Sequence, residues 1–115
     1  MELTKLSNIF DIKYGNGFEL YNLKSFKKRI KNTIPFVART ANNNGISAFV
    51  EVMSDVESFE SGLITVSVGG SVLETFLQIE RFYTVFHILI LYPKYEMSIV
   101  EKLYYCQCIR ANKYK

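Results

Sequence analysis

The chain has 115 residues, of which 49% are hydrophobic and 22% are charged. This length fits one domain, and the composition is that of a globular protein, so an intrinsically disordered chain is excluded. The net charge of +3 is unevenly spread: residues 1–50 hold eight Lys and Arg against three Asp and Glu, whereas residues 51–115 hold six against eight.

The first half of the chain predicts short helices and strands in alternation. Apolar spacing predicts a short helix over residues 3–10, and the strand at 11–14 ends at Gly15-Asn16-Gly17, a turn signal. Residues 22–31 place apolar side chains on one side and lysines on the other, which predicts one or two helical turns. Strands at 33–39 and 46–52 flank an asparagine-rich turn that ends at Gly45.

The second half predicts more strands and then a helix. Residues 54–62 are polar and acidic and indicate a loop or a helical turn, and the strand at 63–68 ends at Gly69-Gly70. Strands are predicted at 72–79 and 83–92. A helix from residue 97 or 98 to about residue 111 has Ser98 as N-cap and Glu101 three residues later, a capping-box pattern. We expect one α+β domain over residues 1–115, with a twisted, mostly antiparallel sheet flanked by short helices at both ends.

No set of residues predicts catalysis. His87 is the only histidine and lies in an apolar strand, where a packed or edge residue is the usual case. Ser67 and Ser71 flank two glycines but lack the G-x-S-x-G spacing of a nucleophile elbow. We therefore expect a protein that is not an enzyme and holds no cofactor or metal.

Cysteines and apolar runs indicate the compartment. Cys106 and Cys108 form a C-x-C pair with no further cysteine, which is short of a zinc site and typical of reduced thiols in an intracellular protein. The start of the chain lacks a signal-peptide core, and the longest apolar run, residues 85–92, is too short to span a bilayer. We expect a cytoplasmic protein with no membrane association.

Two polar groups are candidate contacts for nucleic acid. Arginine and asparagine make bidentate contacts to guanine and adenine edges, and the run after the strand at 33–39 supplies both types. Lysine-rich segments bind phosphates without reading sequence, although a solvated helix face explains such lysines equally well. The candidate base contacts are Arg39, Asn42, Asn43 and Asn44, and the candidate phosphate contacts are Lys24, Lys27, Lys28, Arg29 and Lys31. For the first group the alternative is a solvent-facing hairpin turn.

The order of these segments resembles that of one protein family. The similar stretches are residues 5–15 (KLSNIFDIKYG), 34–45 (IPFVARTANNNG), 63–72 (LITVSVGGSV), 82–84 (FYT) and, for the C-terminal helix, 101–106 (EKLYYC) followed by Ile109 and 112–114 (NKY). Together they resemble the target recognition domain of the specificity subunit of type I restriction–modification systems. The resemblance covers essentially the whole chain.

The resemblance implies a function and a set of partners. Such a domain binds double-stranded DNA at one half of a bipartite site, and it directs a methyltransferase subunit and a restriction subunit of the same system there. It does no chemistry itself, and S-adenosylmethionine is bound by the partner. In a DNA-binding domain, Gly69, Gly70 and Ser71 are candidates to bring backbone and hydroxyl groups close to DNA, because glycines permit a close approach, although a tight turn after the strand explains the two glycines at least as well.

The chain also differs from the family pattern. It carries one domain and no long helix, so we expect a domain truncated at its C-terminus. Residues 84–87 stand where the family tends to have a glycine and more polar residues. Two alternatives remain open: a protein-interaction fragment that pairs with a second half-subunit or forms a homodimer without binding DNA, and a gene remnant without activity.

Overall fold

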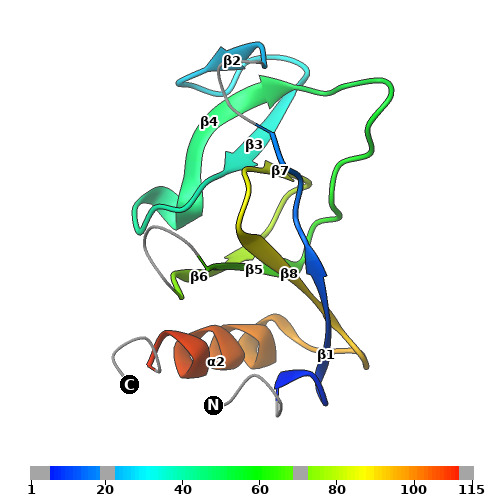
Figure 1. Cartoon of the computed structure of the whole chain (residues 1–115), viewed down its shortest axis with the longest axis vertical. Coiled ribbons are helices and arrows are strands. Elements are labelled where there is room, and N and C mark those ends of the chain that lie inside the picture. The colour runs from blue at the N-terminus through cyan, green and yellow to red at the C-terminus, as the bar shows by residue number, and fades with distance from the viewer. Residues whose placement is uncertain (1–5, 19–22, 69–72, 112–115) are drawn as a thin grey trace.

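The computed structural model describes residues 6–18, 23–68 and 73–111. These residues form two four-stranded sheets and a 12-residue helix, α2 (Ile99–Arg110) (Figure 1). The first sheet has the strand order β1 (Phe10–Tyr14), β8 (Ile88–Pro93), β5 (Leu63–Ser67), β6 (Thr75–Gln78), and every pair is antiparallel. The second sheet has the order β2 (Ser25–Phe26), β4 (Ile46–Glu51), β3 (Thr33–Val37), β7 (Tyr83–Thr84), with only the pair β3–β7 parallel.

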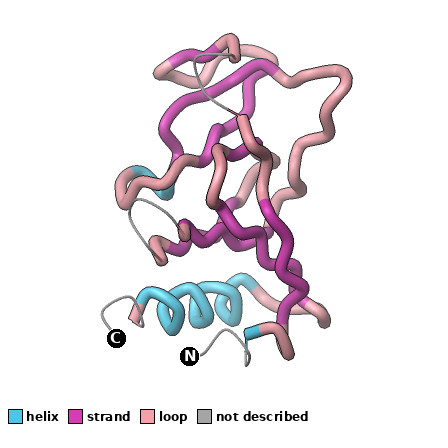
Figure 2. The backbone as a smooth tube through the Cα atoms, viewed as in Figure 1, coloured by secondary structure: helices cyan, strands magenta, loops and turns pink. Residues whose placement is uncertain are grey.

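The first sheet lies between α2 and the second sheet, as Figure 2 shows. Side chains alternate between the two faces of a strand, and β8 follows this rule. Leu91 of β8 packs on the helix side with Cys106 and Ile109 of α2, whereas Ile88 and Ile90 pack on the other side with Val37 of β3. Covering both faces explains why β5 is buried along all five residues.

The second sheet has a smaller core of its own. Ile34, Phe36 and Val50 pack around Tyr83, whose side chain is fully buried. The Tyr83 hydroxyl accepts a hydrogen bond from the backbone N–H of Met53 at 3.1 Å and donates one to the carbonyl of Val56 at 2.7 Å. These bonds attach the loop after β4 to the sheet.

The fold class predicted from the sequence is confirmed as α+β with mostly antiparallel strands, although the strands divide into two sheets. The C-terminal helix is confirmed together with its capping box: the Ser98 hydroxyl accepts from the Glu101 N–H, and the Glu101 carboxylate accepts from the Ser98 N–H. The predicted N-terminal helix is wrong from residue 7 onward, because residues 7–9 form a turn and β1 begins at Phe10. Residues 3–5 lie outside the described part of the chain.

Two further expectations are wrong. Within residues 22–31, the described part forms strand β2 and turns instead of helix, because Phe26 pairs with Phe49 of β4 and the Thr33 hydroxyl bonds the backbone N–H and carbonyl of Ile30. The strand expected over residues 83–92 is split into β7 and β8 by a turn at residues 86–87, where His87 has a φ of 61°. Across the described segments, no helix has the length and apolar character needed to cross a bilayer.

Candidate nucleic-acid interface

The turn between β3 and β4 has left-handed backbone geometry. Asn43, Asn44 and Gly45 form a 3₁₀ turn with φ angles of 50°, 57° and 79°. Glycine adopts this geometry freely, and asparagine tolerates it better than other residues with a side chain. The hairpin predicted from the asparagine run is therefore confirmed, and the Ala38 N–H closes it by donating to the Gly45 carbonyl at 2.8 Å.

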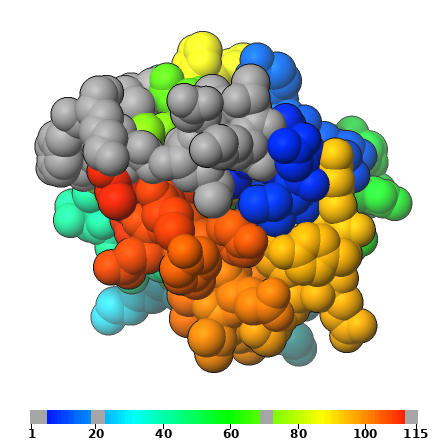
Figure 3. Space-filling view, turned by 90° about the horizontal axis from the view of Figure 1, so that it is seen from below, coloured from blue at the N-terminus to red at the C-terminus, as the bar shows by residue number. Residues whose placement is uncertain are grey.

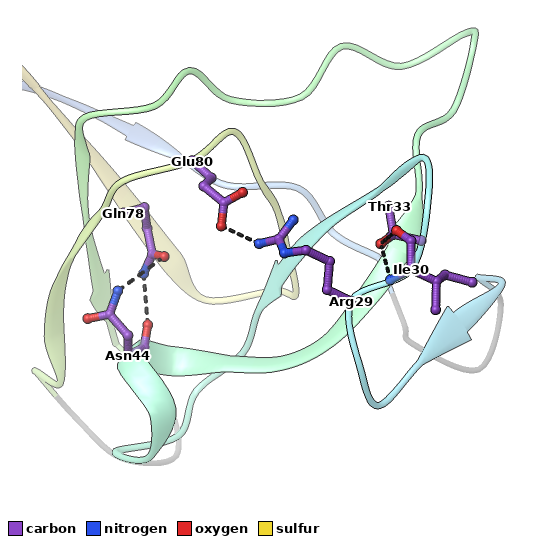
Figure 4. Close-up of polar contacts among 6 residues, drawn as sticks. All are labelled: Arg29, Ile30, Thr33, Asn44, Gln78 and Glu80. Carbon is purple, nitrogen blue, oxygen red and sulfur yellow. Dashed lines mark hydrogen bonds and ion pairs between the residues drawn. The ribbon is translucent and has the colours of Figure 1, made fainter.

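Asn44 connects this turn to the first sheet. Its side-chain amide donates to the carbonyl of Leu77 at 3.0 Å, and the Gln78 amide donates back to the Asn44 carbonyl at 2.9 Å (Figure 4). Gln78 is itself buried and also donates to the Thr65 hydroxyl at 3.2 Å. Since the Asn44 donors are used within the protein, Asn44 positions the turn and is not available to read a base edge.

The other polar side chains of the turn project into solvent. Arg39, Asn42 and Asn43 are exposed. The Asn43 amide nitrogen donates to the Ile46 carbonyl at 3.2 Å, which leaves its amide oxygen free to accept. The guanidinium of Arg39 and the amide of Asn42 have no hydrogen-bond partner among the described residues. The turn therefore presents donors and acceptors of the types that contact guanine and adenine edges.

The predicted phosphate contacts lie at the opposite end of the β3–β4 hairpin, around β2 (Figure 1). Two of the five are paired within the protein: Lys24 lies 3.5 Å from the Glu51 carboxylate, and Arg29 forms an ion pair with Glu80 (Figure 4) and lies over the Phe49 ring. Lys27, Lys28 and Lys31 are exposed and have no described carboxylate within ion-pair distance.

The two groups of candidate residues are thus not brought into one patch. β4 runs between them, and six residues of extended strand span about 17 Å. The third group, Gly69, Gly70 and Ser71, lies outside the described residues. Val68, which precedes it, donates from its backbone N–H to the His87 carbonyl at 2.9 Å.

Arg81 is a further candidate that was not predicted from the sequence. It is exposed and lines a cavity of about 550 Å³ together with Lys31 and Glu51, so a second cation lies close to the phosphate candidates. It also lines a neighbouring cavity with the acidic residues Asp55, Glu57 and Glu60. Arg81 was missed because it is distant from the lysines in sequence, and the pairing of β7 with β3 that brings it near was not predicted.

The described residues contain no group of three or more His, Cys, Asp or Glu side chains that could hold a metal ion. The cysteines are free thiols, with Cys106 buried against the first sheet and Cys108 half-buried.

No protein-family model, no curated protein and no solved structure matches this chain. The resemblance to the target recognition domains of type I specificity subunits therefore stays a prediction from motifs. The function is therefore inferred from the chemistry of the surfaces described above.

Proposed function

We propose that this chain is a DNA-binding recognition domain that directs a methyltransferase and a restriction subunit to one half of a bipartite site. The observation that carries the proposal is the β3–β4 turn, where Arg39, Asn42 and Asn43 are exposed on a backbone held by Asn44. A fixed turn with free arginine and asparagine groups suits base contacts, because little conformational entropy is lost when they bind.

The distance between the base-contact candidates in the turn and the phosphate-contact candidates around β2 agrees with this mode of DNA binding. The major groove of B-DNA is about 12 Å wide and admits a two-stranded β-ribbon. When the turn lies in the groove, the cations about 17 Å away along the hairpin lie outside the groove. At this distance they are placed to contact the phosphates that flank the groove. In this proposal Lys27, Lys28 and Lys31 add affinity without sequence preference, and the chain performs no chemistry of its own.

A binding assay with two sets of variants tests the proposal. Wild-type protein is first used to select preferred duplexes from a randomised pool. Replacing three phosphate contacts in K27Q/K28Q/K31Q is expected to lower the slope of log affinity against log salt by about 3 without changing the preferred sequence. R39A is expected to lower affinity for the preferred duplex by about 1–3 kcal/mol and to relax the preference at one base pair.

K102Q on α2 is the matched control, because it removes one positive charge far from the hairpin. It is expected to retain the wild-type sequence preference. Absence of duplex binding by the wild-type chain at about 50 mM salt contradicts autonomous DNA binding, since nonspecific phosphate contacts are strongest at low salt. If R39A prefers the same DNA sequence as the wild type, Arg39 does not read a base, and the turn is removed from the proposal.

A protein-interaction fragment is the second candidate, and the outer face of α2 favours it. Ile99, Val100, Leu103 and Tyr104 are between 49% and 76% exposed, while Cys106 and Ile109 in the second half of the helix are buried against the first sheet. Figure 3 shows this helix on the surface of the molecule. Contiguous exposed apolar side chains of this kind are typical of contact surfaces.

The occupant that fits this face is a second copy of the chain. An antiparallel pair of α2 helices would bury the exposed apolar side chains of both copies against each other. Light scattering after size-exclusion chromatography is expected to give a dimer mass for the wild type and a monomer mass for V100E/L103E. A monomeric wild type at about 100 µM contradicts this candidate.

A further inference from the structure

A cavity between the end of β1 and the turn before β8 belongs to neither surface described above. It has a volume of about 370 Å³ and is lined by Tyr14, Gly15, Asn16, Gly17, Phe86 and His87. A cavity of this size is at the small end of the range of ligand sites. Its lining combines three aromatic rings with two glycines and one amide.

The three rings are exposed, although aromatic side chains usually pack away from water. Tyr14 is 79% exposed and Phe86 is 53% exposed, and His87 beside them is also classed as exposed. The Phe86 and His87 rings are neighbours, with centroids 6.4 Å apart, whereas Tyr14 stacks on no ring of the described chain. The exposed sides of these rings are therefore available to a flat ligand, and one aromatic stack is a common way to hold such a ligand.

Two features of the backbone hold the rings of Phe86 and His87 in place, and each depends on the residue type at its position. His87 has a φ of 61°, a region that is costly for a residue with a side chain, and its carbonyl is fixed by the Val68 N–H. A Cβ atom at Gly17 would lie 2.4 Å from the Phe86 ring, so this ring rests directly on glycine backbone. The strain and the close approach both serve to present Phe86 and His87 at the cavity.

Asn16 supplies an oriented donor. The backbone N–H of Thr84 donates to its side-chain oxygen at 3.1 Å, and the Thr84 hydroxyl donates to its carbonyl at 3.3 Å. Because a backbone N–H can only donate, the atom that meets it must be the amide oxygen, and this assignment leaves the NH₂ group at the other end. That NH₂ group has no acceptor among the described residues, and Asn16 lines the cavity.

We propose that this cavity binds an unstacked nucleobase, with the base lying against Phe86 and an acceptor on its edge receiving a hydrogen bond from the Asn16 amide. Every base has a π-face for stacking and at least one oxygen or nitrogen acceptor on its edge. The base comes either from a single strand or from an extrahelical nucleotide of a duplex. The inference goes beyond the proposed function, because a turn that reads the major groove needs no unpaired base.

Two fluorescent probes distinguish the sources. One is a short single strand that contains 2-aminopurine, and the other is a duplex with one unpaired 2-aminopurine. Abasic residues on both sides of the 2-aminopurine keep the base of each free probe unstacked and fluorescent. Stacking against an aromatic ring then quenches it, so wild-type protein is expected to quench at least one probe in a saturable titration. Quenching of only the first identifies a single strand as the source, and quenching of only the second identifies an extrahelical base. Absence of quenching with both overturns the inference.

Two variants test the assigned contacts. F86A is expected to weaken binding of the quenched probe at least fivefold, the lower limit for loss of one base–aromatic stack. Y95A, which removes a tyrosine that is 50% exposed in the bend before α2, is the matched control and is expected to bind like wild type. If F86A binds with the wild-type affinity, the cavity is not the site of stacking and the inference fails.

N16D keeps the side-chain oxygen that accepts from the Thr84 N–H and removes the free NH₂ group, so the turn retains its anchor. Its binding is expected to be weaker than that of N8D, which adds the same negative charge at an exposed position near the start of β1. Equal affinities for N16D and N8D contradict the hydrogen bond to the base. Urea unfolding of each variant establishes that the comparison is between folded proteins.

The outcome is separable from that of the proposed function. A fully paired duplex tests the β3–β4 turn through R39A, and the unpaired probes test the cavity through F86A. Loss of duplex preference in R39A with no quenching of either unpaired probe supports the turn alone and overturns the cavity. Quenching that F86A abolishes, with no duplex binding by the wild type, supports the cavity alone.

Discussion

The two sheets of this protein are stabilised in different ways. The first sheet is covered on both faces, and its strands are positioned by apolar side chains that alternate between α2 and the second sheet. The second sheet depends more on polar contacts between residues far apart in sequence, such as Asn44 with Gln78 and Arg29 with Glu80. Apolar burial thus fixes the scaffold, while long-range polar contacts position the side chains that are candidates for binding.

The largest expected effect is at the junction of α2 with the first sheet. Phe10 is fully buried there, with its ring edge-on to Tyr105 at 5.4 Å. Phe10→Ala is expected to lower the free energy of unfolding by about 3–5 kcal/mol, because it removes buried apolar surface and leaves a cavity. Urea unfolding followed by circular dichroism measures this loss. The half-buried Phe49 of the second sheet is the control, and an equal loss in Phe49→Ala contradicts the contrast between the sheets.

In the second sheet, loss of stability is expected from removing a polar contact, the one made by the Tyr83 hydroxyl. Tyr83→Phe keeps the buried ring but leaves the Met53 N–H without its acceptor and the Val56 carbonyl without its donor. An unsatisfied buried group costs about 1–3 kcal/mol, and we expect a loss of that size in urea unfolding. Limited proteolysis is expected to cut the loop after β4 faster in this variant.

Tyr14→Phe is the matched control, because it removes a hydroxyl from a tyrosine that is 79% exposed. Its stability is expected to stay within about 0.5 kcal/mol of wild type. If both variants lose the same stability, the Tyr83 hydroxyl does not hold the loop.

The cap of α2 gives a smaller effect. Ser98→Ala removes the hydroxyl that accepts from the Glu101 N–H at 3.1 Å. Loss of an N-cap costs about 1 kcal/mol, and we expect this decrease in urea unfolding. Ser61→Ala, at an exposed turn position, is the control and is expected to leave stability unchanged. A Ser98→Ala variant as stable as wild type means that packing alone holds the helix.

The sequence predicted more of the first sheet than of the second. The capping box at Ser98 and the apolar strand at 63–68 are local patterns, and both are confirmed. Residues 22–31 were predicted as helix because their apolar spacing fits one, whereas pairing with β4 and the Thr33 hydroxyl decided otherwise. Partners distant in sequence leave no local signal, which is also why the contact of Asn44 with Leu77 was not foreseen.

Some features of the candidate binding residues could likewise be predicted from the local sequence, and others could not. The turn at Asn43 and Asn44 was predictable because left-handed geometry favours asparagine and glycine. Which asparagine is hydrogen-bonded to the first sheet was not predictable, since it depends on where β6 lies. The cavity beside Phe86 was likewise hidden, because the left-handed turn at His87 interrupts an apolar run that otherwise indicates one continuous strand.

The smallest expected effect again concerns the interface of α2 with the first sheet. Burial raises the pKa of the Cys106 thiol from 9.0 to about 11, although Arg110 nearby acts in the opposite direction. In the unfolded chain the thiol ionises near its ordinary pKa of 9.0, whereas in the folded protein it stays protonated until about pH 11. Ionisation between these values therefore favours the unfolded state, and stability from this group is complete below pH 9 and is lost as the pH rises toward 11.

Cys106→Ala isolates this contribution. The variant is less stable than wild type at pH 7, because it leaves a small cavity, but it lacks the ionisable thiol. The difference in unfolding free energy between the two proteins is expected to narrow by roughly 0.4 kcal/mol at pH 9 and further at pH 10. Urea unfolding at pH 7, 9 and 10 measures it. A difference that stays constant with pH means that solvent reaches the thiol in the folded state, and the first sheet is then less tightly covered by α2 than the burial of Cys106 indicates.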